Sequence, residues 1–280
     1  MSLALSTIVA LIVIAVPARA LQVSLSPTTA QLGDTLSLVV QQSPTISSTP
    51  TVKMNGKTYP TFQTSSGNFR ALLPTTPLDK PGTLKIQVTG EGEVKNLTVP
   101  LRNRSFPTQW ITLSGAAGAD ATQMELDRVD AFKKLVTPEK YWNGAFLKPN
   151  AGPITSIYGV RRYYNGEFAE DYYHRGVDYA GDTGSPVIAP APGRIALVGR
   201  VSQGFRVHGN VVGIDHGQGV SSIMMHLSRI DVKEGDFVQA GQRIGAVGST
   251  GAATGPHLHW GLYVHGLAVD PVPWRNQKFD

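Results

Sequence analysis

The chain after residue 20 opens with short runs in which apolar and polar residues alternate. The period-two runs are residues 21–25, 35–40, 51–54, 68–73, 82–89 and 95–101. Neighbouring side chains of a strand point to opposite faces, so this pattern predicts strands with one buried face. The turn-forming pairs Gly33-Asp34, Asn55-Gly56 and Pro81-Gly82 separate the runs. Short strands at this spacing predict an immunoglobulin-like β-sandwich over residues 21–104, with a spacing, docking or wall-binding role.

A helical pattern occupies residues 121–136, inside a linker that we place at residues 105–150. Its apolar positions are Met124, Val129, Phe132, Leu135 and Val136. We expect Asp120 to be the N-cap and Pro138 to stop the helix. The expected function of this helix is to pack one domain on the other.

From about residue 151 the apolar runs become short and are interrupted by glycine. The clearest are residues 213–217, 221–227, 245–248 and 257–264, and helix signals are absent. This predicts an antiparallel, barrel-sandwich-like β-sheet domain over residues 151–280. The predicted fold class is therefore all-β, with an immunoglobulin-like sandwich, one linker helix and a C-terminal β domain.

The N-terminus reads as a targeting segment. Residues 3–17 are apolar and uncharged, and Ala18-Arg19-Ala20 fits a small-x-small cleavage site. We predict a signal peptide over residues 1–20, with an uncleaved anchor as the alternative. In both cases the remainder is exported to the periplasm or cell envelope, close to the membrane if the anchor is retained.

Composition narrows the chemistry. With 41% hydrophobic and 16% charged residues, the chain is globular. It contains no cysteine, so a metal site must use His, Asp or Glu. A net charge of +5 suits an anionic wall or membrane surface, although ordinary solubility charge explains it equally well. Without a basic run interleaved with aromatics, nucleic acid is not an expected partner. A serine hydrolase is excluded by the missing Gly-x-Ser-x-Gly motif.

All seven histidines lie at or after residue 174, and they fall into recognisable segments. His174 and Asp178 are separated by an even spacing, which lets both side chains point to one face of an extended segment. His257 and His259 have the same property in a predicted strand. Taken alone, the pair His174 and Asp178 is weak evidence, because this spacing is common. The pair His257 and His259 is as compatible with a structural role as with catalysis. A single histidine in an apolar run, such as His226, is more often a core residue than a catalyst.

Together these segments resemble the lysostaphin-type, or LytM-like, zinc metalloendopeptidases, which act on peptidoglycan. The resemblance covers about residues 150–273. Its further motifs are residues 154–162, 184–193, 209–217 and 235–245.

The resemblance implies one Zn²⁺ per chain, held by His174, Asp178 and His259. It also implies that His226 and His257 are the catalytic residues, which flank a water whose pKa zinc lowers towards about 7. Asn210 and His216 match positions to which we give supporting or structural roles. His208 and His265 have no partner spacing, so we predict surface or core positions for both.

One position departs from the family. A tyrosine that commonly stands two residues before the catalytic histidine is replaced here by Met224. Tyr163 and Tyr172 are candidates to substitute for it. Both lie in residues 161–173, a predicted loop rich in aromatic and charged residues that we expect to flank a groove for an extended peptide.

The predicted function is therefore that of a monomeric zinc endopeptidase that hydrolyses peptidoglycan peptides. The alternative is an inactive wall-binding module that activates another wall hydrolase. A carrier domain is a weaker reading, because residues 235–245 resemble a biotinyl or lipoyl hairpin but offer no modifiable lysine on a tight turn. The sequence does not identify which peptide bond is cut.

Overall fold

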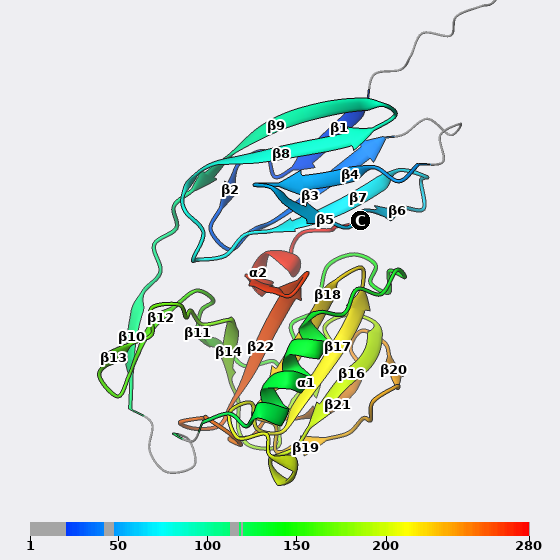
Figure 1. The fold of residues 1–280 in the computed structure, drawn as a ribbon. Helices are drawn as coiled ribbons and strands as arrows, with labels where there is room; N and C mark the ends of the chain where they lie inside the picture. Colours follow the sequence, from blue (N-terminus) through cyan, green and yellow to red (C-terminus); the bar gives the residue numbers. More distant parts are fainter. Residues whose placement is uncertain (1–20, 42–47, 113–117, 119, 280) are drawn as a thin grey trace, which may run out of the picture.

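The computed structural model describes residues 21–41, 48–112, 118 and 120–279 (Figure 1). This part of the chain is mostly strand, with two α-helices, which confirms the predicted all-β class. The predicted signal peptide, residues 1–20, lies outside the described residues. Within them, no helix has both the length and the apolar character needed to cross a membrane.

The N-terminal part is a sandwich of two sheets, which we call the N-terminal sandwich (Figure 1). The buried residues of its strands, such as Leu38, Val52 and Ile86, alternate with exposed ones and form one core between the sheets. One sheet has the order β1 (Gln22–Ser26), β3 (Thr35–Gln41), β7 (Phe69–Pro74), β6 (Phe62–Gln63). The other has the order β2 (Ala30–Gln31), β9 (Glu93–Arg102), β8 (Gly82–Gly90), β4 (Thr51–Met54), β5 (Lys57–Tyr59).

The C-terminal part is built on an eight-stranded antiparallel sheet, which we call the C-terminal sheet. Its core contains the fully buried side chains Tyr179, Ile214 and Trp260. The strand order is β11 (Ile154–Ser156), β14 (Gly176–Ala180), β22 (His257–Val264), β18 (Val220–Met225), β17 (Val211–Gly217), β16 (Gly193–Gly199), β20 (Phe237–Val238), with β23 (Leu267–Val269) also on β22. A three-stranded sheet, β15 (Pro186–Ile188), β21 (Arg243–Ala246) and β19 (Arg229–Ile230), completes this part.

A second three-stranded sheet lies beside the C-terminal sheet, on the left of Figure 1. Its order is β10 (Thr108–Ile111), β12 (Arg161–Tyr164), β13 (Glu167–Phe168), and β10 runs parallel to β12. The prediction of a loop over residues 161–173 is therefore wrong for the first half of this segment, which forms a β-hairpin. Asn165 and Gly166 turn it with φ of 50° and 93°, and an Asn-Gly pair favours this tight turn.

Helix α1 (Gln123–Lys133) confirms the predicted helix but corrects its start and its role. Thr122, not Asp120, is the N-cap, and its Oγ1 accepts a hydrogen bond from the Glu125 N–H at 3.1 Å. The helix packs on β16, and the Phe132 ring lies against Gly213 of β17. It thus covers the C-terminal sheet and does not join the two parts (Figure 1).

Two short helices occur where the sequence shows no helix signal. Helix α2 (Pro271–Trp274) begins at the N-cap Asp270, and the 3₁₀-helix η2 (Val201–Gln203) follows β16. Helix α2 lies between the two parts of the molecule in Figure 1. The Pro-containing segment that forms it was too short to show helical periodicity.

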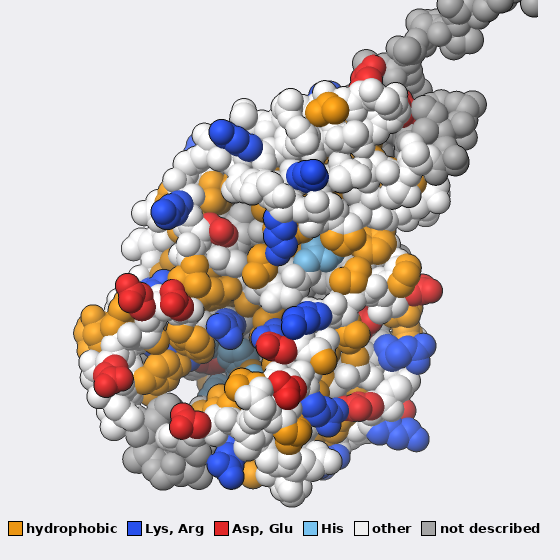
Figure 2. Space-filling model, in the orientation of Figure 1, with side chains coloured by type: hydrophobic (Ala, Val, Ile, Leu, Met, Phe, Trp, Pro, Cys, Tyr) orange, Lys and Arg blue, Asp and Glu red, His pale blue; other side chains and the backbone are white. Residues whose placement is uncertain are grey.

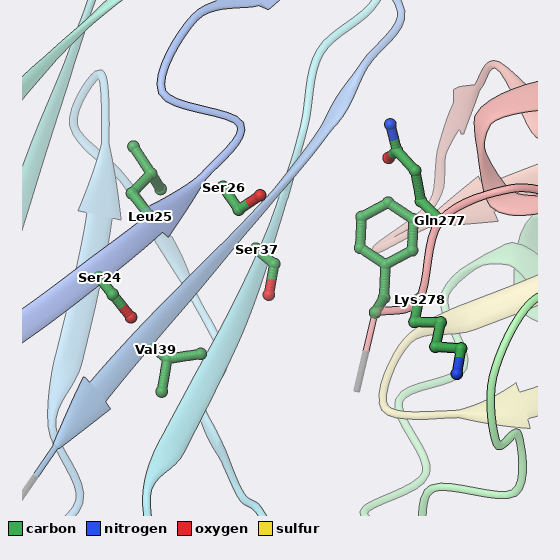
Figure 3. A pocket seen from close by; sticks show the side chains of 8 residues that line it. Ser24, Leu25, Ser26, Ser37, Val39, Gln277 and Lys278 are labelled. Atoms are coloured by element: carbon green, nitrogen blue, oxygen red, sulfur yellow. The ribbon is translucent and has the colours of Figure 1, made fainter.

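Polar contacts join the N-terminal sandwich to the C-terminal sheet. Arg70 of β7 is 2% exposed and donates to the Phe279 carbonyl and to the Gln218 side chain. Arg104 forms an ion pair with Asp270 at 2.7 Å. A groove of about 480 Å³ runs between β1, β3 and residues 277–279, and its lining has no histidine or carboxylate (Figure 3).

Candidate metal centre and peptidase site

Strand register brings three of the predicted residues together. In the antiparallel pair of β14 and β22, Asp178 lies directly opposite His259. His174 lies just before β14, four residues ahead of Asp178. The distances are 3.1 Å from His174 Nε2 to Asp178 Oδ1, 2.9 Å from His259 Nδ1 to the same oxygen, and 3.0 Å between the two nitrogens. All three side chains are buried, and we call them the His-Asp-His triad.

Backbone contacts orient the rings of this triad. His174 Nδ1 donates to the Ile157 carbonyl at 2.7 Å, since a carbonyl can only accept. In a neutral imidazole, Nε2 then points a lone pair at Asp178 Oδ1, an arrangement that a shared cation stabilises. The His259 ring rests on Gly176, where a Cβ atom would lie 2.8 Å from Nε2 and 2.3 Å from the Trp260 carbonyl oxygen. Glycine is therefore required at position 176.

The charge states of the triad suit a divalent cation. Burial by itself raises the pKa of Asp178, but contacts with the rings of His174 and His259, which are positively charged when protonated, outweigh it and hold the pKa far below its usual range. Burial lowers the pKa of His259 to about 4, against the opposing effect of Asp178. The three ligand atoms lie within 4.8 Å of one another. Two imidazole nitrogens and one carboxylate oxygen form a donor set that fits zinc.

The remaining two histidines of the predicted site lie beside the triad. The ring centroids of His226 and His257 are 4.8 Å apart, and we call these two residues the histidine pair. His226 is 6.3 Å from His259 by ring centroids, and His257 Nε2 is 4.0 Å from Asp178 Oδ1. The prediction that His226 lies within a strand is wrong, because β18 ends at Met225 and His226 has φ of 65°.

Both rings of the histidine pair are fixed by backbone carbonyls. His226 Nδ1 donates to the Thr250 carbonyl, and His257 Nδ1 donates to the Gly255 carbonyl, each at 2.8 Å. In the neutral tautomer this leaves Nε2 of each ring as a proton acceptor. Burial, followed by repulsion from a charged His257, lowers the pKa of His226 to about 3. His226 is therefore neutral at physiological pH.

Asn210 and His216, for which we predicted supporting or structural roles, make specific contacts. Asn210 donates to the Leu227 carbonyl at 2.9 Å and accepts from the Val201 N–H. His216 is fully buried, with Nδ1 donating to the Pro192 carbonyl and Nε2 bonded to Ser222 Oγ. Both residues support the backbone around the C-terminal sheet.

Met224, which replaces the family tyrosine, and its two candidate substitutes Tyr163 and Tyr172 lie in different surroundings. Met224 is fully buried in the core and pairs with Trp260. Tyr163 stacks on Trp110 at 4.8 Å, and Tyr172 packs edge-on against Tyr164 at 5.9 Å. The guanidinium of Arg175 also lies over the Tyr172 ring, 5.2 Å from its centroid. Substitution of Tyr163 or Tyr172 for the family tyrosine stays a prediction.

Sequence reasoning missed two charged groups near the site. Arg162 Nη2 lies 3.6 Å from Asp178 Oδ2. Glu125 of α1 is fully buried and accepts hydrogen bonds from the N–H groups of residues 206–208 and from His208 Nδ1. The His208 carbonyl in turn accepts from the His226 N–H. The Asn165-Gly166 turn signal could have placed Arg162 on a strand, whereas nothing in the helical pattern marks Glu125 as buried.

His265 differs from the other histidines in its surroundings. It lies between the two parts, with its ring 5.9 Å from that of Tyr59 in the N-terminal sandwich. Burial lowers the pKa of His265 to about 4, so its imidazole is neutral. We predicted a surface or core position for His265, and it is half-buried, between the two. His208 is half-buried and its ring is bonded to Glu125, a partner that the spacing of residues in the sequence did not indicate.

Of the triad and the histidine pair, His257 is the most exposed, with 20% of its side chain accessible. Figure 2 shows histidine atoms at the floor of a hollow in the C-terminal half of the molecule, with charged side chains of both signs around it.

Comparisons with known proteins agree with this geometry. The model for Peptidase family M23 matches residues 172–271. The chain is 46% identical over 99 residues to the DD-carboxypeptidase/endopeptidase Mpg of Neisseria meningitidis and 41% identical over 99 residues to the peptidoglycan DD-endopeptidase ShyA of Vibrio cholerae. Each of these alignments covers 35% of this chain but only 22% of the relative.

A solved structure extends the likeness beyond the matched segment. A crystal structure from Pseudomonas aeruginosa, described as a candidate peptidase M23, has a TM-score of 0.62 and 29% identity, and the match covers 80% of this chain and 86% of that one. The resemblance predicted from the sequence motifs is thus confirmed. The triad and the histidine pair all lie within residues 172–271, the segment of this chain that matches the model for Peptidase family M23.

Proposed function

We propose that this protein is a zinc-dependent endopeptidase that hydrolyses peptide bonds of peptidoglycan. One observation carries the proposal: three buried ligand atoms converge within 4.8 Å, and two further imidazoles lie beside them with Nε2 free to accept protons. The name of the Vibrio cholerae relative, a peptidoglycan DD-endopeptidase, supports the substrate class.

In this proposal one Zn²⁺ per chain is held by His174 Nε2, Asp178 Oδ1 and His259 Nδ1. Zinc supplies an activated water and polarises the scissile carbonyl. The histidine pair moves the protons: one neutral imidazole accepts a proton from the attacking water. Together the two rings stabilise the developing oxyanion and protonate the leaving amine. Because burial lowers the pKa of His226 to about 3, this ring is neutral at physiological pH and its Nε2 is available to accept a proton.

We place the protein in the cell envelope as an exported monomer. The apolar segment over residues 3–17 and the cell-wall substrate of the relative support this location. The domain limits proposed from the sequence, residues 21–104 and 151–280, assign the metal site entirely to the C-terminal domain. The N-terminal sandwich is then a spacing, docking or wall-binding element.

The second candidate is an inactive module that binds the wall and activates another hydrolase. The observation in its favour is Met224, which is buried where the family commonly carries a tyrosine. The complete set of five His and Asp side chains favours the catalytic role.

The test uses the full chain purified with zinc. We expect one zinc ion per chain by atomic absorption and release of soluble fragments from purified sacculi, with mass spectrometry identifying the cut bond in walls of different cross-link type. The matched control is His226→Ala, which is expected to keep zinc and release no fragments. Zinc binding without fragment release by the wild type, from every wall type, would support the inactive module instead.

A further inference from the structure

The two oxygens of the Asp178 carboxylate have different surroundings. Oδ1 faces the two histidines of the triad at 2.9 and 3.1 Å. Oδ2 faces the guanidinium of Arg162, whose Nη2 lies 3.6 Å away. The Arg162 and Asp178 side chains are equally secluded, each 11% exposed. An ion pair withdrawn from water to this degree is screened less than a surface pair.

Arg162 is itself held by two polar contacts. Its Nε donates to Gln109 Oε1 at 3.2 Å, and its Nη1 donates to the Tyr164 hydroxyl at 3.3 Å. Gln109 lies directly opposite Arg162 in the parallel pairing of β10 with β12. Because Tyr164 is two residues further along β12, it projects from the same face of the strand as Arg162. The guanidinium is thus fixed at three points, of which Asp178 is one.

We propose that Arg162 is a positioning residue for the metal centre, holding Asp178 Oδ2 so that Oδ1 alone is presented to the ion. Gln109 extends this support to β10, which arrives directly from the N-terminal sandwich. The inference rests on the proposed zinc function. Gln109, Arg162 and Tyr164 all precede residues 172–271, so the support comes from outside the segment that matches the family.

The alternative is that Arg162 is only a nearby positive charge, and the two readings predict opposite signs. A guanidinium close to a divalent cation repels it, so removing a bystander charge tightens zinc binding. Removing a residue that orients a ligand weakens zinc binding, typically by about 10–100-fold. The sign of the change in affinity therefore separates them.

The experiment measures zinc affinity of the full chain by competition with a chelator. We expect Arg162→Gln to bind zinc about 10–100-fold more weakly than the wild type. Arg162→Lys keeps the charge but not the planar fork, so it should fall between the two. Gln109→Leu should show a smaller loss than Arg162→Gln. The matched control is Arg161→Gln, because Arg161 projects from the opposite face of β12, donates to the Glu170 carbonyl and lies over the Phe168 ring.

A spectroscopic readout distinguishes positioning from general stability. With Co²⁺ in place of zinc, Arg162→Gln should change the visible absorption spectrum, because Asp178 is then free to offer both oxygens, whereas Arg161→Gln should not. Melting of the metal-free proteins shows whether each variant folds, and Arg162→Lys carries the test if Arg162→Gln does not. Equal or tighter zinc binding by folded Arg162 variants overturns this inference alone. A wild type that binds no zinc overturns the proposed function and this inference together.

Discussion

The metal half and the proton-transfer half of the site are held together in different ways. The His-Asp-His triad is joined by side-chain contacts of 2.9 to 3.1 Å across the register of β14 and β22. The two rings of the histidine pair share no described hydrogen bond; each is bonded to a loop carbonyl, that of Thr250 for His226 and that of Gly255 for His257. Strand pairing therefore sets the geometry of the triad. The geometry of the histidine pair depends on the loops that carry Thr250 and Gly255.

Gly248 is the point at which those loops meet. Its carbonyl accepts from the His257 N–H at 3.1 Å. A Cβ atom at this position would lie 2.3 Å from the Ser228 nitrogen and 2.7 Å from the His226 carbonyl oxygen. The close approach of two backbones brings His226 and His257 together. Loop geometry can thus alter proton transfer without disturbing the triad.

The largest expected effect is on the metal half. Asp178→Asn removes the negative charge that the triad shares, so we expect zinc affinity to fall by more than the about 100-fold that loss of a supporting residue costs. Hydrolysis should disappear with the metal. Zinc content after dialysis measures this, and a variant that retains stoichiometric zinc would contradict the assignment of Asp178 as a ligand.

The next effect should be confined to the proton-transfer half. His226→Ala and His257→Ala are each expected to lower the rate of hydrolysis by about 10²–10⁴-fold, since that is the usual contribution of a general acid or base. Zinc content should be unchanged in both. Measuring fragment release and zinc on the same samples checks the division of the site, which fails if either variant loses the metal.

A smaller effect is expected at Glu125, which supports the loop behind His226. Glu125→Gln weakens several charge-assisted hydrogen bonds, so the free energy of unfolding should fall by about 2–3 kcal/mol. Thermal melting of the metal-free protein measures this change. Unaltered stability would show that the buried carboxylate is not needed to hold residues 206–208.

Glu125 also predicts a pH dependence. Burial by itself raises the pKa of Glu125, but hydrogen bonds from His208 and the neighbouring N–H groups lower it to about 2. The folded pKa is below the ordinary value of 4.5, so the stabilisation is present above pH 4.5 and is lost as pH falls towards 2. Melting temperatures between pH 2 and 6 should fall less steeply in Glu125→Gln than in the wild type.

The smallest effect returns to the metal half. Ser156 Oγ lies 3.4 Å from His174 Nδ1, whereas the Ile157 carbonyl lies at 2.7 Å. Because the carbonyl remains, Ser156→Ala should change the free energy of zinc binding by less than about 1 kcal/mol. Chelator competition measures it. A large loss would mean that the hydroxyl, not the carbonyl, orients His174.

The metal half was accessible from the sequence because strands have a simple period. The even spacing of His174 and Asp178, and of His257 and His259, predicted which side chains share a face. The resemblance in sequence motifs then predicted that these two segments belong to one site. The register of β14 and β22 brings them together. The N-terminal strands were predictable for the same reason, and β4 has the predicted bounds.

The parts that sequence reasoning missed depend on tertiary contacts. Arg162 was assigned to a loop because its strand is only four residues long and pairs with β10, a distant segment. Helix α1 was expected to join two domains. It packs on the C-terminal sheet instead, because Gly213 has no side chain and leaves room for the Phe132 ring. The apolar pattern of the helix does not predict that Glu125 is buried. Its burial is possible because the backbone N–H groups of residues 206–208, distant in sequence, bond its carboxylate.

The buried joint between the two parts has a thermodynamic consequence. Arg70 is sealed between the N-terminal sandwich and the C-terminal segment, and Leu72 of β7 belongs to the core of the C-terminal sheet. Parts that share buried contacts in this way are expected to unfold in a single cooperative transition. A ligand that binds the native histidine cluster then raises the melting temperature of the whole molecule by mass action. The strands of the N-terminal sandwich would then protect their amide hydrogens more strongly when the site in the C-terminal part is filled.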